Sequence, residues 1–231
     1  MIDMSELGNF MCPDWNDFPI GVIYATGGLL GTSPIICGGY SYSIAGPTDE
    51  CYIINSTKVE LVGKMSTKRA SAASVTINDK SLWIIGGTDG SDNFLSSSEF
   101  VNVGGAIIPG PELQNPLAAH AMINVKKDLT MVIGGFSPDI GEVAQTFYYN
   151  HANKVWSNGP NMNQKRQNHA VGIVTDEVTK EKHVIVTGGT YYYNGLIHLK
   201  STEFLLDATW VIGENIHSEK LHYKCKYSNT S

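Results

Sequence analysis

Short runs of apolar residues recur along the chain, and four of them end in a pair of glycines. Polar residues and further glycines separate the runs, and each run has the length of a strand rather than of a helix. The glycine pairs are Gly38–Gly39, Gly86–Gly87, Gly134–Gly135 and Gly188–Gly189. Their first members are 48, 48 and 54 residues apart. This regular recurrence predicts an internal repeat of about 50 residues.

Other residues recur in phase with the glycine pairs. Arg69 and Arg166 each open an apolar stretch, and the intervening unit has Leu117 at that place, an apolar residue to fill the same space. Trp156 and Trp210 each stand three residues before a single glycine near the end of a unit. Each unit is predicted to hold four strands joined by turns rich in Gly, Asn, Asp and Ser. Such a unit corresponds to one blade of a β-propeller.

Three acids, Glu50, Glu99 and Glu203, also recur and begin the strand that follows the loop after a glycine pair. Repetition favours a structural role over a catalytic one. A carboxylate at this place can accept backbone N–H groups or pair with an arginine of a neighbouring strand, such as Arg69 or Arg166.

The strand after each of the last three of these loops carries an aromatic residue, Phe100, Phe147 or Phe204. Together with the glycine pair, the arginine and the spaced tryptophan, this pattern resembles the kelch repeat. That family includes kelch-type adaptor proteins and the central domain of galactose oxidase. The resemblance implies an all-β, kelch-type β-propeller with four recognisable four-stranded blades in a single domain, residues 1–231. The predicted blades are residues 19–65, 66–113, 114–162 and 163–213, with partial closing segments at 1–18 and 214–231. Kelch propellers usually have more blades, so the chain is interpreted as a truncated propeller whose open blade edges favour self-association.

Composition and charge mainly argue against certain classes of protein. Hydrophobic residues make up 42% of the chain and charged residues 16%, which argues against disorder and against a coiled coil. The net charge of −6 disfavours nucleic-acid binding. No apolar run reaches the roughly 18 residues that span a bilayer. The N-terminus has no signal-peptide pattern, so a cytoplasmic location is the default expectation.

Two of the four cysteines fall at informative places in the repeat. Cys37 precedes the first glycine pair and Cys51 lies at the start of the next strand, its expected antiparallel neighbour. The two thiols are either joined in a disulfide or buried as small apolar groups. A disulfide would favour an oxidising, extracellular location. Asn55 begins an Asn-Ser-Thr glycosylation triplet in a turn, which is common by chance.

The loops between the second and third strands are the best candidates for binding, since a propeller presents them on one face. They span residues 40–49, 88–98, 136–145 and 190–202 and mix aromatic with acidic side chains, which suits protein recognition. The plain alternative is a set of ordinary solvated loops. The candidate binding residues are Tyr40, Tyr42, Asp89, Asp92, Phe136, Asp139, Tyr191, Tyr192, Tyr193 and His198.

Candidate catalytic chemistry is sparse. His120 and His169 occupy the same repeat position, which favours a structural role. No metal-ligand spacing, nucleophile motif or phosphate-binding loop is found, so no metal or cofactor is expected. The sequence therefore predicts a non-enzymatic scaffold that binds protein partners. The alternatives are a secreted carbohydrate-binding module and a fragment of a galactose-oxidase-like or other sugar-acting propeller enzyme.

Overall fold

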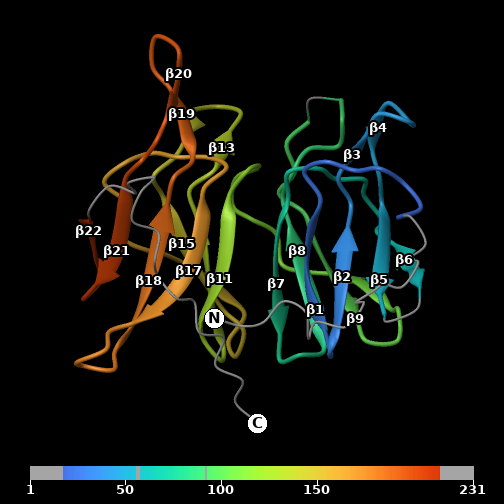
Figure 1. Ribbon diagram of the computed structural model, residues 1–231, viewed down its shortest axis with the longest axis horizontal. Helices are drawn as coiled ribbons and strands as arrows, with labels where there is room; N and C mark the ends of the chain where they lie inside the picture. The colour runs from blue at the N-terminus through green and yellow to red at the C-terminus, as the bar shows by residue number, and fades with distance from the viewer. Residues whose placement is uncertain (1–17, 56–57, 92, 214–231) are drawn as a thin grey trace, which may run out of the picture. The chain divides into compact units, whose positions relative to one another are not determined.

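The computed structural model describes residues 18–55, 58–91 and 93–213. Most of these residues form four antiparallel sheets, each of four strands in a simple meander (Figure 1). Sheet 1 contains β1 (Thr26–Leu30), β2 (Ser33–Cys37), β5 (Glu50–Ile54) and β6 (Val59–Lys64). Sheet 2 contains β7 (Ala73–Ile77), β8 (Ser81–Ile85), β9 (Ser98–Asn102) and β10 (Ile107–Pro109).

Sheets 3 and 4 have the same strand order. Sheet 3 contains β11 (Ala121–Lys126), β12 (Leu129–Ile133), β15 (Thr146–Asn150) and β16 (Val155–Asn158). Sheet 4 contains β17 (Ala170–Thr175), β18 (Lys182–Thr187), β21 (Thr202–Leu206) and β22 (Thr209–Ile212). Each of the four sheets lies within one of the predicted blade ranges, and the prediction of an all-β fold built from four-stranded blades is confirmed.

Three small hairpins are inserted between the second and third strands of sheets 1, 3 and 4. They are β3 (Tyr40–Ser41) with β4 (Gly46–Pro47), β13 (Phe136–Ser137) with β14 (Gly141–Glu142), and β19 (Thr190–Tyr192) with β20 (Leu196–His198). The β19–β20 hairpin projects well beyond the strands of its own sheet (Figure 1). These hairpins lie in three of the four loops that the sequence singles out for binding.

The chain divides into two compact units, each with its own core. The first holds sheets 1 and 2, and the second holds sheets 3 and 4 together with residues 94–96. The core of the first unit consists of Leu30, Ile35, Cys37, Cys51, Met65, Leu82, Ile84 and Val101. The core of the second consists of Met131, Ile133, Met162, Val184, Val186 and Trp210. Alternate residues of a strand point to the same face, which is why Leu82 and Ile84 enter one core together.

Both glycines of every pair have a positive φ, between 57° and 105°. At several of these glycines, a side chain is also excluded by lack of space. A Cβ on Gly38 would lie 2.4 Å from the carbonyl oxygen of Arg69, and the N–H of Gly39 donates to that same carbonyl at 2.8 Å. Gly135 and Arg166 repeat this bond at 2.9 Å in the second unit. The glycine pairs at Gly38–Gly39 and Gly134–Gly135 thus allow close backbone contact between neighbouring repeats.

The strand register corrects one alignment made from the sequence. The N–H groups of Gly38, Gly86 and Gly188 donate to the carbonyls of Glu50, Ser97 and Ser201, respectively. Glu50 is therefore the counterpart of two serines rather than of Glu99 and Glu203. Its carboxylate contacts Lys64 and Tyr52 instead of an arginine. The loops before these strands differ in length, so counting residues from the glycines shifts the alignment.

Several features predicted from the sequence lie outside the described residues. These are Asp92, the Ser56–Thr57 part of the glycosylation triplet, the N-terminal segment up to residue 17 and the C-terminal segment from residue 214. The single-domain organisation and the closing segments stay predictions. In the part of the chain that the structure describes, no helix has the length and apolar character needed to cross a membrane.

Candidate functional site

A buried arginine organises sheet 2. Arg69 Nη1 donates hydrogen bonds to the carbonyl oxygens of Gly86 (2.9 Å) and Ser97 (3.0 Å), and Nη2 lies 3.0 Å from Glu99 Oε1. Glu99 Oε2 accepts the backbone N–H of Ser66 at 2.7 Å. Burial lowers the pKa of the Arg69 guanidinium, and Glu99 offsets part of that shift. Arg69 thus ties the loop before β7 to the ends of β8 and β9.

Sheet 4 repeats this arrangement. Arg166 Nη1 donates to the carbonyl oxygens of Gly188 (2.7 Å) and Ser201 (3.2 Å), and Nη2 lies 2.7 Å from Glu203 Oε1. Glu203 Oε2 accepts the backbone N–H of Asn163 at 2.7 Å. The side chains of both ion pairs are at most 5% exposed. Their contacts lie within their own units, which assigns them a structural role.

Sheet 3 lacks the ion pair. Leu117 stands at the arginine position, and Phe147 pairs with Val132 in the register where Glu203 pairs with Val186. Leu117 is buried at this position, and there is open space beside its side chain. A cleft of about 170 Å³ lies there. It is lined by Asn115, Leu117, Ser137, Asp139, Ile140, Val143, Gln145 and Phe147.

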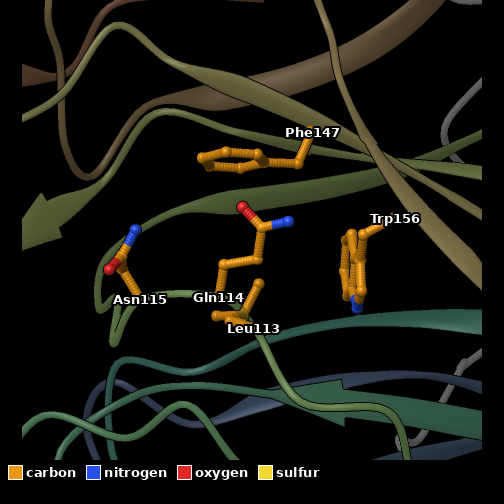
Figure 2. Close-up of a pocket in the computed structure, with 5 residues that line it drawn as sticks. All are labelled: Leu113, Gln114, Asn115, Phe147 and Trp156. Atoms are coloured by element: carbon orange, nitrogen blue, oxygen red, sulfur yellow. The ribbon is translucent and has the colours of Figure 1, made fainter.

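A smaller hollow of about 10 Å³ adjoins the cleft and shares Asn115 and Phe147 with it. Figure 2 shows the rings of Phe147 and Trp156 on two sides of this hollow, with the amide of Gln114 reaching up toward Phe147. We call the two hollows together the sheet 3 cleft. Its mouth is formed in part by Asp139 and Ile140 of the β13–β14 hairpin, so it opens among the loops that the sequence singles out for binding.

The candidate residues of the first unit have different surroundings. Tyr40 and Tyr42 meet edge to face with ring centroids 5.4 Å apart, and Tyr42 is 77% exposed. Asp89 is occupied within its own turn, where it accepts the N–H of Ser91 and the amide of Asn93, and these bonds lower the pKa of Asp89. Tyr42 is thus available for contact with a partner, whereas Asp89 shapes its loop.

The candidates in the second unit also separate into packed and exposed side chains. Phe136 stacks on Phe94 at 5.5 Å and supports its hairpin. Asp139 and His198 are exposed. Tyr191 lies under Lys165, whose Nζ is 5.8 Å from the ring centroid. The remaining two, Tyr192 and Tyr193, are 65% and 68% exposed.

A buried carboxylate that the sequence analysis missed holds the β19–β20 hairpin in place. Glu142 of β14 accepts the backbone N–H of Tyr192 at 3.0 Å and the side-chain amide of Gln167 at 3.2 Å. Its other oxygen lies 3.8 Å from Lys165 Nζ. Glu142 therefore connects the hairpins of sheets 3 and 4. Pro47 and His198 stand at the corresponding place in the hairpins of sheets 1 and 4, so the periodic pattern carried no signal for Glu142.

The two histidines of the repeat are buried beside glycine pairs. A Cβ on Gly135 would lie 2.6 Å from the Cβ of His120, and one on Gly189 would lie 2.9 Å from that of His169. Burial lowers the pKa of His120 to about 4, and burial together with the nearby charge of Arg166 lowers that of His169 to about 3. Both are neutral at pH 7, and their position supports a packing role.

Cys37 and Cys51 face each other in the β2–β5 register and are joined by a disulfide. Both are buried in the core of the first unit. Asn55 lies in the nearby turn, where its side chain accepts the N–H of Lys58. Among the residues that the structure describes, no group of three or more His, Cys, Asp or Glu side chains is placed to share a metal ion.

Comparison with known proteins identifies the architecture. No family model and no curated protein matches the sequence. The structure is similar to a solved kelch-repeat β-propeller titled "Structure of YjhT", with a TM-score of 0.71 and 12% sequence identity. The match covers 84% of this chain and 71% of that one. Together with the repeated four-stranded sheets, glycine pairs and arginine–glutamate pairs, it shows that the chain has the fold of a kelch-repeat β-propeller.

Proposed function

We propose that this protein is a non-enzymatic interaction scaffold that binds a protein partner through the hairpins inserted in its sheets. The observation that supports the proposal best is the β19–β20 hairpin. Tyr192 and Leu196 pair across it and are 65% and 57% exposed, and Tyr193 at its tip is 68% exposed. Tyrosine is enriched among the residues that contribute most to protein–protein affinity.

The support beneath these side chains strengthens the proposal. The opposite face of the hairpin carries Tyr191 and Ile197, which are half-buried. Lys165 covers the Tyr191 ring, and Glu142 holds the backbone of Tyr192. An ordered hairpin loses little conformational freedom on binding, so more of the contact energy appears as affinity.

The test is a double variant, Tyr192→Ala with Tyr193→Ala. A partner captured by the unmodified chain is expected to bind the double variant at least about tenfold more weakly, since each aromatic anchor typically contributes more than 1 kcal/mol. The control is Val178→Ala, which alters a side chain that is 90% exposed in the turn between β17 and β18. Equal affinity of the double variant and the control would contradict the proposal.

A secreted carbohydrate-binding module is the second candidate, and the Cys37–Cys51 disulfide favours it. Intact mass before and after reduction, measured on protein from its native source, tests for the bond and for sugar on Asn55. Binding to a panel of glycans then separates the two candidates.

The absence of enzyme activity and self-association are also proposals. Metal analysis of the purified protein tests the first, since stoichiometric copper or zinc would contradict a non-enzymatic scaffold. Self-association through open sheet edges predicts a mass in analytical ultracentrifugation that rises with protein concentration.

A further inference from the structure

Sheets 2 and 4 each contain a buried arginine side chain that the sheet 3 cleft lacks. In both, one guanidinium nitrogen donates to two carbonyl oxygens, those of Gly86 and Ser97 in sheet 2. The N–H of Gly86 also donates to the Ser97 carbonyl at 3.0 Å, and in sheet 3 Gly134 donates to Gln145 at the same distance. Gly134 and Gln145 are thus the corresponding residues. The side chain of Leu117 has no N–H group, and its backbone N–H donates to Leu95, so Leu117 leaves the carbonyls of Gly134 and Gln145 without the arginine donor.

The backbone around the cleft keeps the conformation that accompanies the ion pair in the other sheets. Ala119, two residues after Leu117, has a φ of 54°. Ser71 and Asn168, two residues after the arginines, have φ values of 55° and 53°. The side chains at the arginine and glutamate positions have changed, while the main chain around them has not.

We propose that the sheet 3 cleft binds the guanidinium group of an arginine side chain of a protein partner, in the place that Arg69 and Arg166 fill in their own sheets. The proposal rests on the proposed function, since it specifies what the partner presents to the hairpin face. The carbonyl oxygens of Gln145, which lines the cleft, and of Gly134, the counterpart of Gly86, would accept its N–H groups. The apolar side chains of Leu117 and Val143 would contact its methylene stem.

The charge of the cleft favours a cation. Asp139 is the one charged residue among those that line it, and it lies exposed at the mouth. The ring of Phe147 adds an aromatic surface of the kind on which guanidinium groups stack. The chain as a whole carries a net charge of −6, which attracts basic partners.

A carboxylate ligand fits less well. In sheet 4 the N–H groups of Asn163 and Gln164 hold the Glu203 carboxylate, and Gln114 and Asn115 occupy the corresponding loop of sheet 3. The hollow beside Gln114 has a far smaller volume than the one beside Leu117, about 10 against 170 Å³. The larger space therefore lies beside Leu117 at the arginine position, with Phe147 of the glutamate position forming part of its wall.

The test is an NMR titration of the full chain with the peptide acetyl-Gly-Arg-Gly-amide. The expected result is saturable shifts of the Gly134 and Gln145 amide signals, with no change at Gly86 and Ser97, whose carbonyls Arg69 already occupies. The same peptide with citrulline in place of arginine keeps the shape but loses the charge and is expected not to bind. Equal binding of the citrulline peptide, or equal shifts at Gly86 and Ser97, would overturn the proposal.

Two variants sharpen the test. Asp139→Asn is expected to weaken peptide binding about threefold, in the range of an exposed ion pair, whereas Glu177→Gln removes an exposed charge elsewhere and leaves it unchanged. The double variant Leu117→Arg with Phe147→Glu supplies the ion pair from the chain itself and is expected to abolish binding. Unchanged binding by a folded double variant, or equal effects of Asp139→Asn and Glu177→Gln, would contradict the proposal.

The outcome is separable from that of the proposed function. Peptide binding in the cleft does not require Tyr192 or Tyr193. If the arginine peptide fails to bind while the tyrosine variants still lose a partner, the cleft proposal is wrong and the scaffold function stands. If the peptide binds but the tyrosine variants still bind the partner, the cleft proposal stands and the proposed binding through the hairpin tyrosines is wrong.

Discussion

Arg166 and Glu203 form an ion pair in which Nη2 and Oε1 are 2.7 Å apart and neither side chain is exposed to solvent. Each is also bonded to the backbone, Arg166 to two carbonyls and Glu203 to two N–H groups. Replacing one member of such a buried ion pair lowers the free energy of unfolding strongly, because the remaining buried charge no longer has an opposite charge beside it. Sheet 3 shows that the same backbone tolerates the loss of both charges together.

We therefore predict that Arg166→Leu destabilises the second unit by about 3–5 kcal/mol, since it leaves Glu203 buried and unpaired. The double variant Arg166→Leu with Glu203→Phe copies the residues of sheet 3 and is expected to recover more than half of that loss. Urea unfolding measures both. Lys58→Met, which removes an exposed partner of Glu60, is the control and should cost less than about 1 kcal/mol. A double variant as unstable as the single one would contradict this view.

The glycine pairs are predicted to be required for space as well as for their φ values. Gly135 and Gly141 both have a positive φ, 105° and 78°, but a Cβ would be crowded only at Gly135. Gly141→Ala is expected to cost about 1–2 kcal/mol for the backbone conformation alone. Gly135→Ala adds the clash with His120 and is expected to cost at least about 2 kcal/mol more. Equal losses in thermal unfolding would show that only conformation matters.

The buried histidines predict that the second unit loses stability in mild acid. Burial lowers the pKa of His120 to about 4 from an ordinary value of 6.5, so the unfolded chain binds the proton more tightly than the folded one. The stabilisation is present above pH 6.5 and is lost as the pH falls from there toward 4, by up to about 3 kcal/mol.

Hydrogen exchange at pH 7 and pH 5 tests this prediction with an internal control. Ala25 and Ala72 of the first unit contact the same glycine position that His120 and His169 contact in the second. Protection is expected to fall more in sheets 3 and 4 than in sheets 1 and 2, and His120→Leu should reduce the difference. An equal loss in both units, unaffected by this variant, would speak against the histidines.

The Cys37–Cys51 disulfide is predicted to stabilise the first unit. It closes a loop of 14 residues, for which restriction of the unfolded chain contributes about 3 kcal/mol. In a background with Cys12 and Cys225 replaced by serine, reduction is expected to lower the melting temperature by about 6–12 °C. Hydrogen exchange should place the loss in sheets 1 and 2. No difference between oxidised and reduced protein would argue that the two buried thiols pack as well as the bond.

The spacing of the glycine pairs predicted a fold of repeated four-stranded sheets. This inference succeeded because each pair acts locally: Gly38, Gly86, Gly134 and Gly188 all have the positive φ that ends the second strand of a sheet. The arginine–glutamate pairing at Arg69 and Arg166 was also accessible from the sequence, since both repeats have an arginine before their first strand and a glutamate near the start of their third strand, although the two intervals are 30 and 37 residues.

Only the tertiary structure decided which residues share a site. The sequence pattern aligned Glu50 with Glu99, but the strand register aligns Glu50 with Ser97. The two differ because the loop before Glu50 and the loop before Ser97 have different lengths. Glu142 reaches β19 across about 50 residues of chain, a contact that no repeat spacing encodes. The sheet 3 cleft depends on how much of the arginine position Leu117 leaves unfilled. Side-chain packing sets that volume, and the order of residues along the chain does not reveal it.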